Sequence, residues 1–340
     1  MSHRKVHLVG SFPFDSTREV FDLCGPSLQG LLERIPDGEP GIRSQWINWQ
    51  LTEVLPGTEQ LEVGGQGHIP NIPPFPTYRI KPGFAAADVK FPPLGYARAA
   101  IDSYRTLKEY QSLGKLDAGL RLQVSLPTPF VIAFAYFVPE VFGAIWPRYE
   151  AAMFAEVDAM LRVIPAQELA IQWDIAAEVT VLETPALEQR YTRAALVTGL
   201  VRAIDHVAVP AEVGLHLCYG DPGGKHVVEP KDLSLLVGLA NEIRAAARRP
   251  ISWLHMPVPQ SRSDAAYFQS LTDLERDPGT RLHLGLVHRA DGVEGGRARM
   301  RAAQRVVADF GIATECGLGR RPKDQIAEVL SIHAQLARHE

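Results

Sequence analysis

Short apolar runs alternate with amphipathic segments along most of this chain. The apolar runs predict buried strands over 6–10, 32–35, 120–125, 169–174, 213–218, 251–255, 282–287 and 312–315. Apolar positions at helical spacing predict helices over 18–23, 42–54, 97–112, 140–163, 188–206, 232–247, 264–274, 298–310 and 324–338. Because strand and helix alternate about eight times, the pattern predicts an α/β fold whose parallel sheet closes into a (β/α)8 TIM barrel.

Residues 55–93 interrupt this alternation after the second strand and its helix. The segment is rich in Pro and Gly, with IPNIPPFP at its centre, and it is also apolar. A solvated linker would be more polar, so we expect an ordered but irregular insertion in a single domain spanning residues 1–340. The alternative is a doubly wound open sheet, which would place a glycine-rich phosphate turn after a strand. No G-x-G-x-x-G follows any predicted strand.

Composition narrows the class of protein. The 340 residues are 46% hydrophobic and 22% charged, which suffices for a large core, and the formal net charge of −4 argues against nucleic-acid or anionic-membrane partners. No apolar run reaches the roughly 18 residues of a membrane span, and the N-terminal apolar stretch is too short for a signal peptide. Three cysteines cannot form a closed disulfide framework. We therefore expect a cytoplasmic enzyme acting on a small molecule, with its oligomeric state left open.

Two of the three cysteines stand at predicted strand ends, where a barrel of this kind carries its active site. His216 and Cys218 are two apart on one strand, so their side chains share a face and form a soft ligand pair suited to zinc. Cys316 follows the last strand, and its side chain would reach the same mouth of a closed barrel. The alternative is that both cysteines are small buried hydrophobic residues.

Five short motifs stand at the strand ends in order: GSFP, DGE, QWD, HLCYG and ECGLGRR. In this order they resemble the catalytic C-terminal domain of cobalamin-independent methionine synthase, in the superfamily it shares with uroporphyrinogen decarboxylase. The resemblance implies a (β/α)8 barrel in which zinc binds the acceptor thiol as a thiolate for methyl transfer. It implies zinc ligands at His216, Cys218 and Cys316. It also implies that Ser11, Glu39 and Asp174 hold the amino-acid part of homocysteine.

The chain departs from that family where the sixth strand ends. The family has a glutamate zinc ligand there, whereas this chain reads ISWLHMPVP. His255 is the nearest replacement: it could be the fourth ligand, or it could hydrogen-bond substrate while water fills that position. Full methionine synthases also carry an N-terminal barrel that helps to bind folate, and this chain starts at the catalytic barrel. The loops after the third and seventh strands differ as well. We therefore expect a methyl donor other than folate.

Further polar residues near the strand ends are candidates with two interpretations each. Asp174 could bind an ammonium group or act as a general base, or it could form an ion pair with a neighbouring Arg; Glu178 follows four residues later. Arg43 could clamp a substrate carboxylate or form a salt bridge with Glu39. His288 and Asp291 could transfer a proton at the barrel mouth, or could cap a helix and bond to a loop.

Three functions remain open from the sequence. The first is a zinc-dependent methyl or alkyl transferase that activates a thiol, with methylfolate, a methyl-corrinoid protein or a small methylated metabolite as donor. The second is a zinc-dependent lyase or hydrolase, demethylase-like, that acts on a small non-thiol metabolite. The third is a metal-free enzyme resembling uroporphyrinogen decarboxylase, in which the cysteines are incidental.

Overall fold

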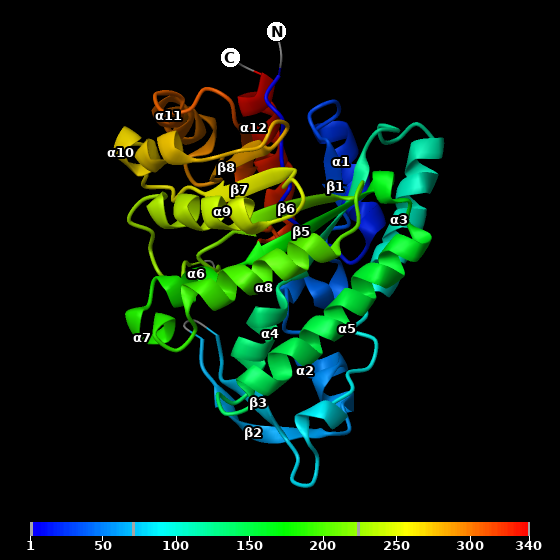
Figure 1. The fold of residues 1–340 in the computed structure, drawn as a ribbon. Helices are drawn as coiled ribbons and strands as arrows, with labels where there is room; N and C mark the ends of the chain where they lie inside the picture. The colour runs from blue at the N-terminus through cyan, green and yellow to red at the C-terminus, as the bar shows by residue number, and fades with distance from the viewer. Residues whose placement is uncertain (1–2, 70–71, 223–224, 339–340) are drawn as a thin grey trace.

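A curled, fully parallel sheet forms the centre of the molecule. The computed structural model describes residues 3–69, 72–222 and 225–338. Over these residues the sheet has seven strands, all paired in parallel, with one shift of register between the last two. Figure 1 shows how the strands lie side by side. In sheet order they are β1 (Arg34–Pro36), β4 (Arg121–Pro127), β5 (Leu169–Ile175), β6 (Glu212–Leu217), β7 (Trp253–Pro257), β8 (Arg281–Val287) and β9 (Gly311–Thr314).

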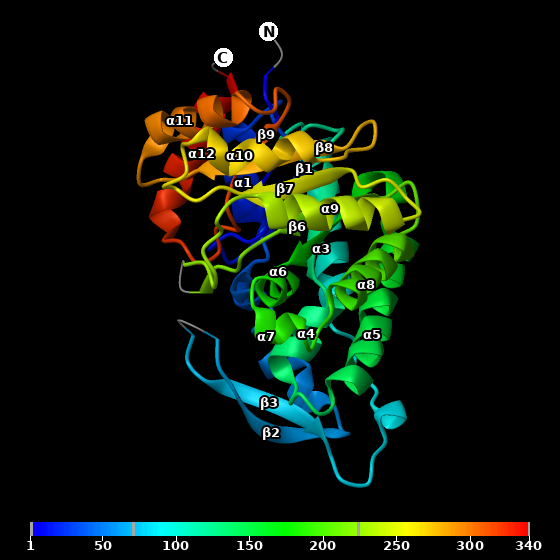
Figure 2. The same ribbon diagram turned by 60° about the vertical axis from the view of Figure 1, so that its left-hand side comes forward.

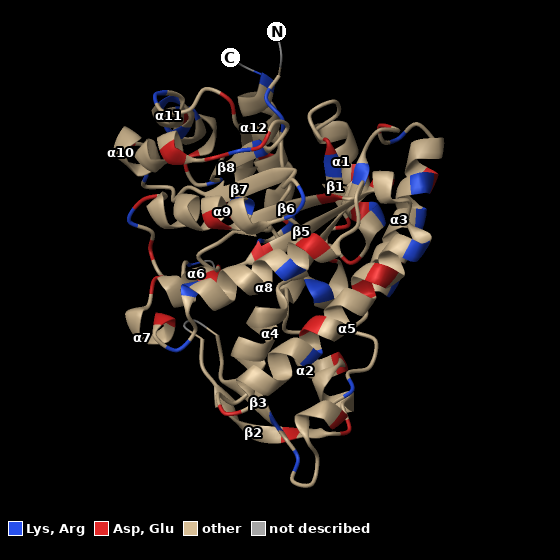
Figure 3. Ribbon diagram, in the orientation of Figure 1, with Lys and Arg blue, Asp and Glu red and all other residues tan. Residues whose placement is uncertain are grey.

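Helices surround the outside of this sheet, as Figure 2 shows. The longer ones are α1 (Thr17–Ser27), α3 (Tyr96–Ser112), α5 (Phe142–Val163), α8 (Arg193–His206), α9 (Ser234–Ala246), α11 (Gly292–Gln304) and α12 (Ile326–Arg338). The shorter ones are α2 (Gln50–Glu53), α4 (Pro129–Tyr136), α6 (Ala177–Leu182), α7 (Pro185–Glu188) and α10 (Ala265–Phe268). Lys and Arg are interspersed with Asp and Glu along the outer helices (Figure 3). None of the described helices is long and apolar enough to cross a membrane.

The α/β class and the parallel sheet are confirmed, whereas the predicted first strand over 6–10 is largely wrong. That segment makes an isolated parallel bridge, between Val6 and Ile312 of β9. Its later carbonyl groups bond to side chains instead of a neighbouring strand. Gln123 Nε2 donates to the Leu8 carbonyl at 2.9 Å, and Gln172 Nε2 donates to the Val9 carbonyl at 2.6 Å. These amides satisfy the backbone without a ladder, so the segment lies beside the seven strands with one bridge only.

The segment 55–93 is more regular than its composition predicts. Strands β2 (Leu61–Gly67) and β3 (Phe75–Ile80) form an antiparallel hairpin, with a shift of register between Val63 and Gly65. The prediction of an irregular insertion is therefore wrong over these two strands. The glycines of β2 weakened the strand signal, because glycine is unfavourable in a strand interior and often marks a bulge. In Figure 2 the hairpin extends beyond α4 at the end of the molecule opposite the termini.

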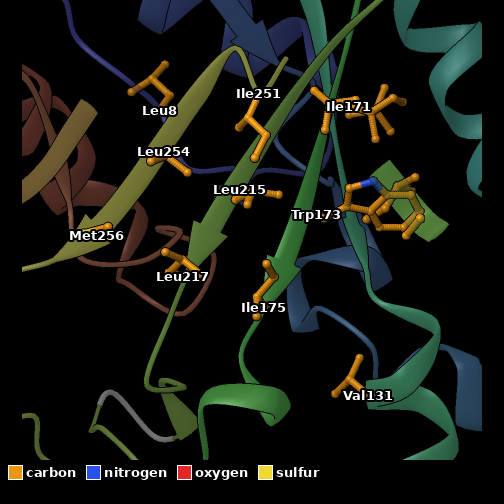
Figure 4. Close-up of a cluster of buried hydrophobic side chains, with 14 of the residues drawn as sticks. Leu8, Val131, Ile171, Trp173, Ile175, Leu215, Leu217, Ile251, Leu254 and Met256 are labelled. Atoms are coloured by element: carbon orange, nitrogen blue, oxygen red, sulfur yellow. The ribbon is translucent and has the colours of Figure 1, made fainter. Parts of the chain in front are cut away.

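The two faces of the central strands differ in chemistry. Side chains that point toward the helices are large and apolar, and they form the buried cluster drawn in Figure 4, which includes Ile171, Trp173, Ile175, Leu215, Leu217, Leu254 and Met256. The residues between them, Gln172, Asp174, His216 and His255, are buried and polar. Strand alternation thus puts the aliphatic core on the outside of the sheet and polar side chains on its concave side.

Replacing Gly214 by alanine should destabilise the fold severely. A Cβ on Gly214 would lie 1.8 Å from Cε2 of Trp253, its partner on β7, and the Arg34 guanidinium lies over the Trp253 ring, 4.1 Å from a ring centroid. We expect the free energy of unfolding to fall by about 3 kcal/mol or more in urea denaturation. Gly143→Ala in α5 is the matched control, because a Cβ there meets no atom within 4 Å. Equal stability of the two variants would contradict the packing described here.

Candidate metal centre

His216, Cys218 and Cys316 come together at one end of the sheet. His216 lies near the end of β6, Cys218 directly follows that strand, and Cys316 follows β9. Their ligand atoms all lie within 4.8 Å of one another, and among the described residues no other such group of three was found. One imidazole and two thiols are a donor set that suits zinc, and three protein donors leave a position free in a tetrahedral site.

The two thiols are not equivalent. Cys316 has its pKa held well below its ordinary value because the Cys218 thiol donates to it, with His216 and the Arg320 guanidinium beside it. Arg320 Nη2 lies 3.7 Å from the Cys316 sulfur and also donates to Asp221 at 2.6 Å. Since thiolates bind zinc and thiols do not, the surroundings of Cys316 favour the ligating form.

His255 lies behind His216, and its ligand atoms are not part of the group. Its Nδ1 is 2.7 Å from Nδ1 of His216, and its Nε2 is 3.0 Å from the carbonyl oxygen of Thr314. Burial, with His216 and His283 nearby, lowers the pKa of His255 well below the usual range. Because both ring nitrogens already have partners, the structure does not place His255 as a fourth ligand.

We call the cluster of His216, Cys218 and Cys316 the metal group. This group opens into a cavity of about 2310 Å³. The sheet side of this cavity is lined by Ser11, Glu39 and Asp174, and the opposite side by the hairpin and α4, including Phe75 and Phe134. Ser11 is held by the loop after β9, because Gly319 donates its backbone N–H to the serine oxygen at 3.3 Å. The structure thus brings all three residues expected to bind an amino-acid substrate to the cavity that contains the metal group.

Glu39 and Asp174 are two carboxylates in a buried setting. Burial raises the pKa of Asp174 to about 6, although Gln172 donates to it at 2.9 Å. The pKa of Glu39 is raised well above its usual value by burial and then by repulsion from Asp174. Glu39 has φ of 49°, a left-handed conformation, and its N–H donates to Asp37 at 2.8 Å. Two carboxylates held this way would gain from a cation between them.

Two residues expected to bind substrate lie elsewhere. Arg43 forms its salt bridge with Asp37 at 2.7 Å, and among the described residues it makes no bridge to Glu39. Glu178 is buried within α6, away from the cavity lining, and neither carboxylate oxygen has a hydrogen-bond partner among the described residues. Both expectations are therefore corrected: Arg43 supports the loop that carries Glu39, and Glu178 is a core residue.

His288 and Asp291 both line the cavity, but their polar atoms are engaged differently. His288 Nε2 donates to the Val258 carbonyl at 2.8 Å, which leaves Nδ1 facing Glu315 at 3.7 Å. Asp291 accepts two hydrogen bonds from Arg299, at 2.6 and 2.8 Å, and this pairing lowers its pKa. Asp291, at the start of α11, is thus held by its ion pair with Arg299. His288 keeps one polar atom, Nδ1, directed toward another cavity residue, Glu315.

Four cavity residues escaped the sequence reasoning: Asp221, His226, Glu315 and Arg320. Glu315 and Arg320 lie inside the ECGLGRR motif, and Asp221 directly follows HLCYG, so the motifs that contain the cysteines were an available signal. His226 follows no predicted strand end, yet its Nε2 lies 3.4 Å from Glu315. Burial would lower its pKa, but the carboxylates of Glu315 and Glu229 raise it to about 9. Only the fold of the loop after β6 could have located it.

Comparisons with known proteins identify the fold class. Neither a protein-family model nor a curated protein sequence matches the chain. A B12-independent methionine synthase from Shewanella sp. W3-18-1, solved with selenomethionine, superposes with a TM-score of 0.58 at 14% identity, covering 99% of this chain and 98% of that one.

Two further solved structures agree. A candidate vitamin-B12 independent methionine synthase from Listeria monocytogenes has a TM-score of 0.56 at 13% identity, covering 99% of this chain and 98% of its own. A methyltransferase from Methanosarcina mazei has a TM-score of 0.56 at 12% identity, covering 98% of this chain and 94% of its own. The chain therefore has the curled α/β fold of these proteins over nearly its whole length.

The metal group predicts a defined response to cysteine substitution. We expect purified protein to carry about one zinc ion per chain, and Cys218→Ser and Cys316→Ser each to lose most of it, because a hydroxyl is a poor soft ligand. Elemental analysis by mass spectrometry measures the content. Cys24→Ala is the control, since Cys24 is buried in α1 outside the group. Full zinc content in both serine variants would show that these residues do not bind the metal.

The buried carboxyl of Glu178 should make stability depend on pH. Burial raises its pKa from 4.5 to about 7, so the folded protein holds a proton that the unfolded chain releases. Stability contributed by this group is therefore lost as pH rises from about 5 to about 8. Relative to wild type, Glu178→Gln should gain about 2 kcal/mol in free energy of unfolding over that interval. Chemical denaturation at several pH values tests this, with the exposed Glu59→Gln as control. A constant difference would show the expectation to be wrong.

Proposed function

We propose that this protein is a zinc-dependent alkyltransferase, in the simplest case a methyltransferase, whose acceptor is the sulfur of a small aminothiol. The observation that carries the proposal is the convergence of His216, Cys218 and Cys316 beside Glu39 and Asp174 in one cavity. The metal group and the paired carboxylates would bind the two ends of one molecule that carries both a thiol and an ammonium group.

The donor set supports thiol chemistry more than hydrolysis. His216, Cys218 and Cys316 would hold the metal. When bound, zinc lowers the pKa of a coordinated thiol so that a thiolate is present at neutral pH. Two cysteine thiolates already donate charge to the metal, which makes it a weak activator of water. Hydrolysis or elimination on a non-thiol metabolite is therefore the second candidate function, and the assays below distinguish it from alkyl transfer to a thiol.

Glu39, Asp174 and Ser11 would hold the amino-acid end of the acceptor. Burial and mutual repulsion raise the pKa values of the two carboxyl groups, and an ammonium ion between them would relieve that repulsion. The Ser11 hydroxyl accepts from the Gly319 N–H, and it would donate its own proton to a substrate carboxylate. An ammonium ion bound between Glu39 and Asp174 would account for two carboxylates on one buried wall of the cavity.

The rest of the cavity would admit the alkyl donor. Its volume of about 2310 Å³ far exceeds that of an aminothiol, and Phe134 and Phe137 supply an apolar wall. The neighbours described as methionine synthases and a methyltransferase support methyl as the group transferred. A small methylated metabolite, methylfolate and a methyl-corrinoid protein are the donors to assay. Of these we expect methylfolate to be poor, given the altered loops after β4 and β8.

Cobalt in place of zinc gives a direct test of thiol entry. The visible spectrum of the cobalt protein should shift when homocysteine is added and should stay unchanged with homoserine, which has a hydroxyl in place of the thiol. Transfer of a methyl group to homocysteine from one of the three donors would then establish the activity. Turnover of a substrate without a thiol partner, with no spectral response to thiols, would favour the lyase or hydrolase instead.

Asp174→Asn should weaken aminothiol binding by about tenfold to a hundredfold, because it removes one charge from the ammonium site. Titration of the cobalt spectrum measures this affinity, and metal content should stay at the wild-type level. The matched control is 3-mercaptopropionate, which has the thiol and carboxylate but no ammonium group, and its affinity should change little. An equal loss for both thiols would mean that Asp174 acts through the metal group and not on the ammonium.

A further inference from the structure

Three neighbouring strands place a row of polar side chains at one level of the sheet. Asp174 of β5 is in register with His216 of β6, and His216 is in register with His255 of β7. In parallel strands, residues in register point to the same side, so all three reach the concave face. His255 is therefore the lateral neighbour of His216, on the side away from Asp174.

The partners of His255 determine where its proton is. Nε2 lies 3.0 Å from the Thr314 carbonyl oxygen, and a carbonyl can only accept, so Nε2 must carry a proton. The ring is fully buried beside His7, His216 and His283, and no carboxylate among the described residues bonds to it. Because an unpaired charge is costly in such surroundings, the ring is neutral. A neutral imidazole has one proton, so Nδ1 of His255 presents a lone pair.

That lone pair in turn fixes His216. The two Nδ1 atoms are 2.7 Å apart, and a contact this short between nitrogens requires one proton between them. Because His255 has none to give at Nδ1, His216 must donate from its own Nδ1. Its remaining nitrogen, Nε2, is then the one available to bind a metal.

We infer that His255 is a positioning residue that holds His216 in the Nδ1–H tautomer and so directs the Nε2 lone pair to the metal. The inference rests on the proposed function only in naming zinc as that metal. It assigns His255 neither of the roles expected from the sequence, ligand or substrate contact. It also leaves the fourth metal position to the substrate.

The Thr314 carbonyl, which accepts the hydrogen bond from His255, belongs to the same turn as Cys316. Thr314 is the last residue of β9, and its hydroxyl donates to the Cys316 carbonyl at 2.8 Å. The backbone that presents the Cys316 sulfur therefore also presents the carbonyl that orients His255. Any shift of this turn would disturb the thiolate and imidazole ligands together.

Ring-nitrogen NMR of protein labelled with ¹⁵N-histidine tests the tautomers directly. In zinc-loaded protein we expect His216 with a protonated Nδ1 and a metal-bound Nε2. In both zinc-loaded and metal-free protein we expect His255 with a protonated Nε2 and an unprotonated Nδ1. A proton on Nδ1 of His255 overturns the inference, whatever the metal content.

Two substitutions at His255 distinguish the effect of losing the Nδ1 acceptor from the effect of losing the imidazole ring. His255→Leu removes the acceptor at similar size and should weaken zinc binding by about tenfold to a hundredfold in chelator competition. His255→Asn keeps an oxygen acceptor near the position of Nδ1 and should restore affinity to within about threefold of wild type. His283→Leu is the control: His283 is buried next to His255 in register, and neither of its ring nitrogens has a hydrogen-bond partner among the described residues.

Each outcome decides one question. Equal weakening in the Leu and Asn variants overturns the inference, and so does wild-type zinc affinity in His255→Leu. Failure of the proposed function looks different, because protein without alkyl transfer to thiols can still show the expected ring-nitrogen pattern. Circular dichroism of all three variants confirms that each is folded before affinities are compared.

Discussion

The chemistry of this protein depends on the register of β5, β6 and β7. Asp174, His216 and His255 share one level of the sheet only because each strand pairs at this offset from its neighbour. A slip of one residue would turn His216 toward the helices and would bring Leu215 or Leu217 to the cavity. The register is held from both sides: by the apolar cluster beneath the helices, and by Trp253 filling the space that Gly214 leaves open.

A concave face lined with polar groups would be costly if those groups lacked partners, since each unpaired buried group costs about 1–3 kcal/mol. Gln172 avoids much of this cost, because it is the hydrogen-bond partner of several of these groups. Its amide donates to the Val9 carbonyl and to Asp174, and its oxygen bonds to Nε2 of His7. The same side chain therefore holds the N-terminal segment, including Gly10 and Ser11, against the sheet and orients a carboxylate of the proposed substrate site. The segment needs only one bridge to β9 because side chains replace the missing ladder.

The sequence predicted the parallel sheet and the metal group because both depend on local signals: apolar periodicity for the strands, and ligand types two apart at a strand end. It could not predict contacts that depend on loop conformation. Arg43 pairs with Asp37, and Glu39 adopts a left-handed backbone; neither feature follows from a local sequence pattern. Glu178 is the second residue of α6, and whether its carboxylate reaches the cavity or the core depends on how that helix packs.

The neutral partner of His216 has an electrostatic consequence for the whole site. Cys218 and Cys316 would each bring a negative charge to a metal, and Glu39 and Asp174 stand nearby on the same cavity wall. Arg320 contributes one positive charge, and Asp221 already pairs with it. A carboxylate at position 255 would add one more negative charge to this buried group, and the unfavourable energy of like charges grows where water is excluded. An imidazole anchored to a backbone carbonyl orients His216 without that charge. It thereby adds no further charge to a site where, in the proposed function, the thiol of the substrate becomes an anion.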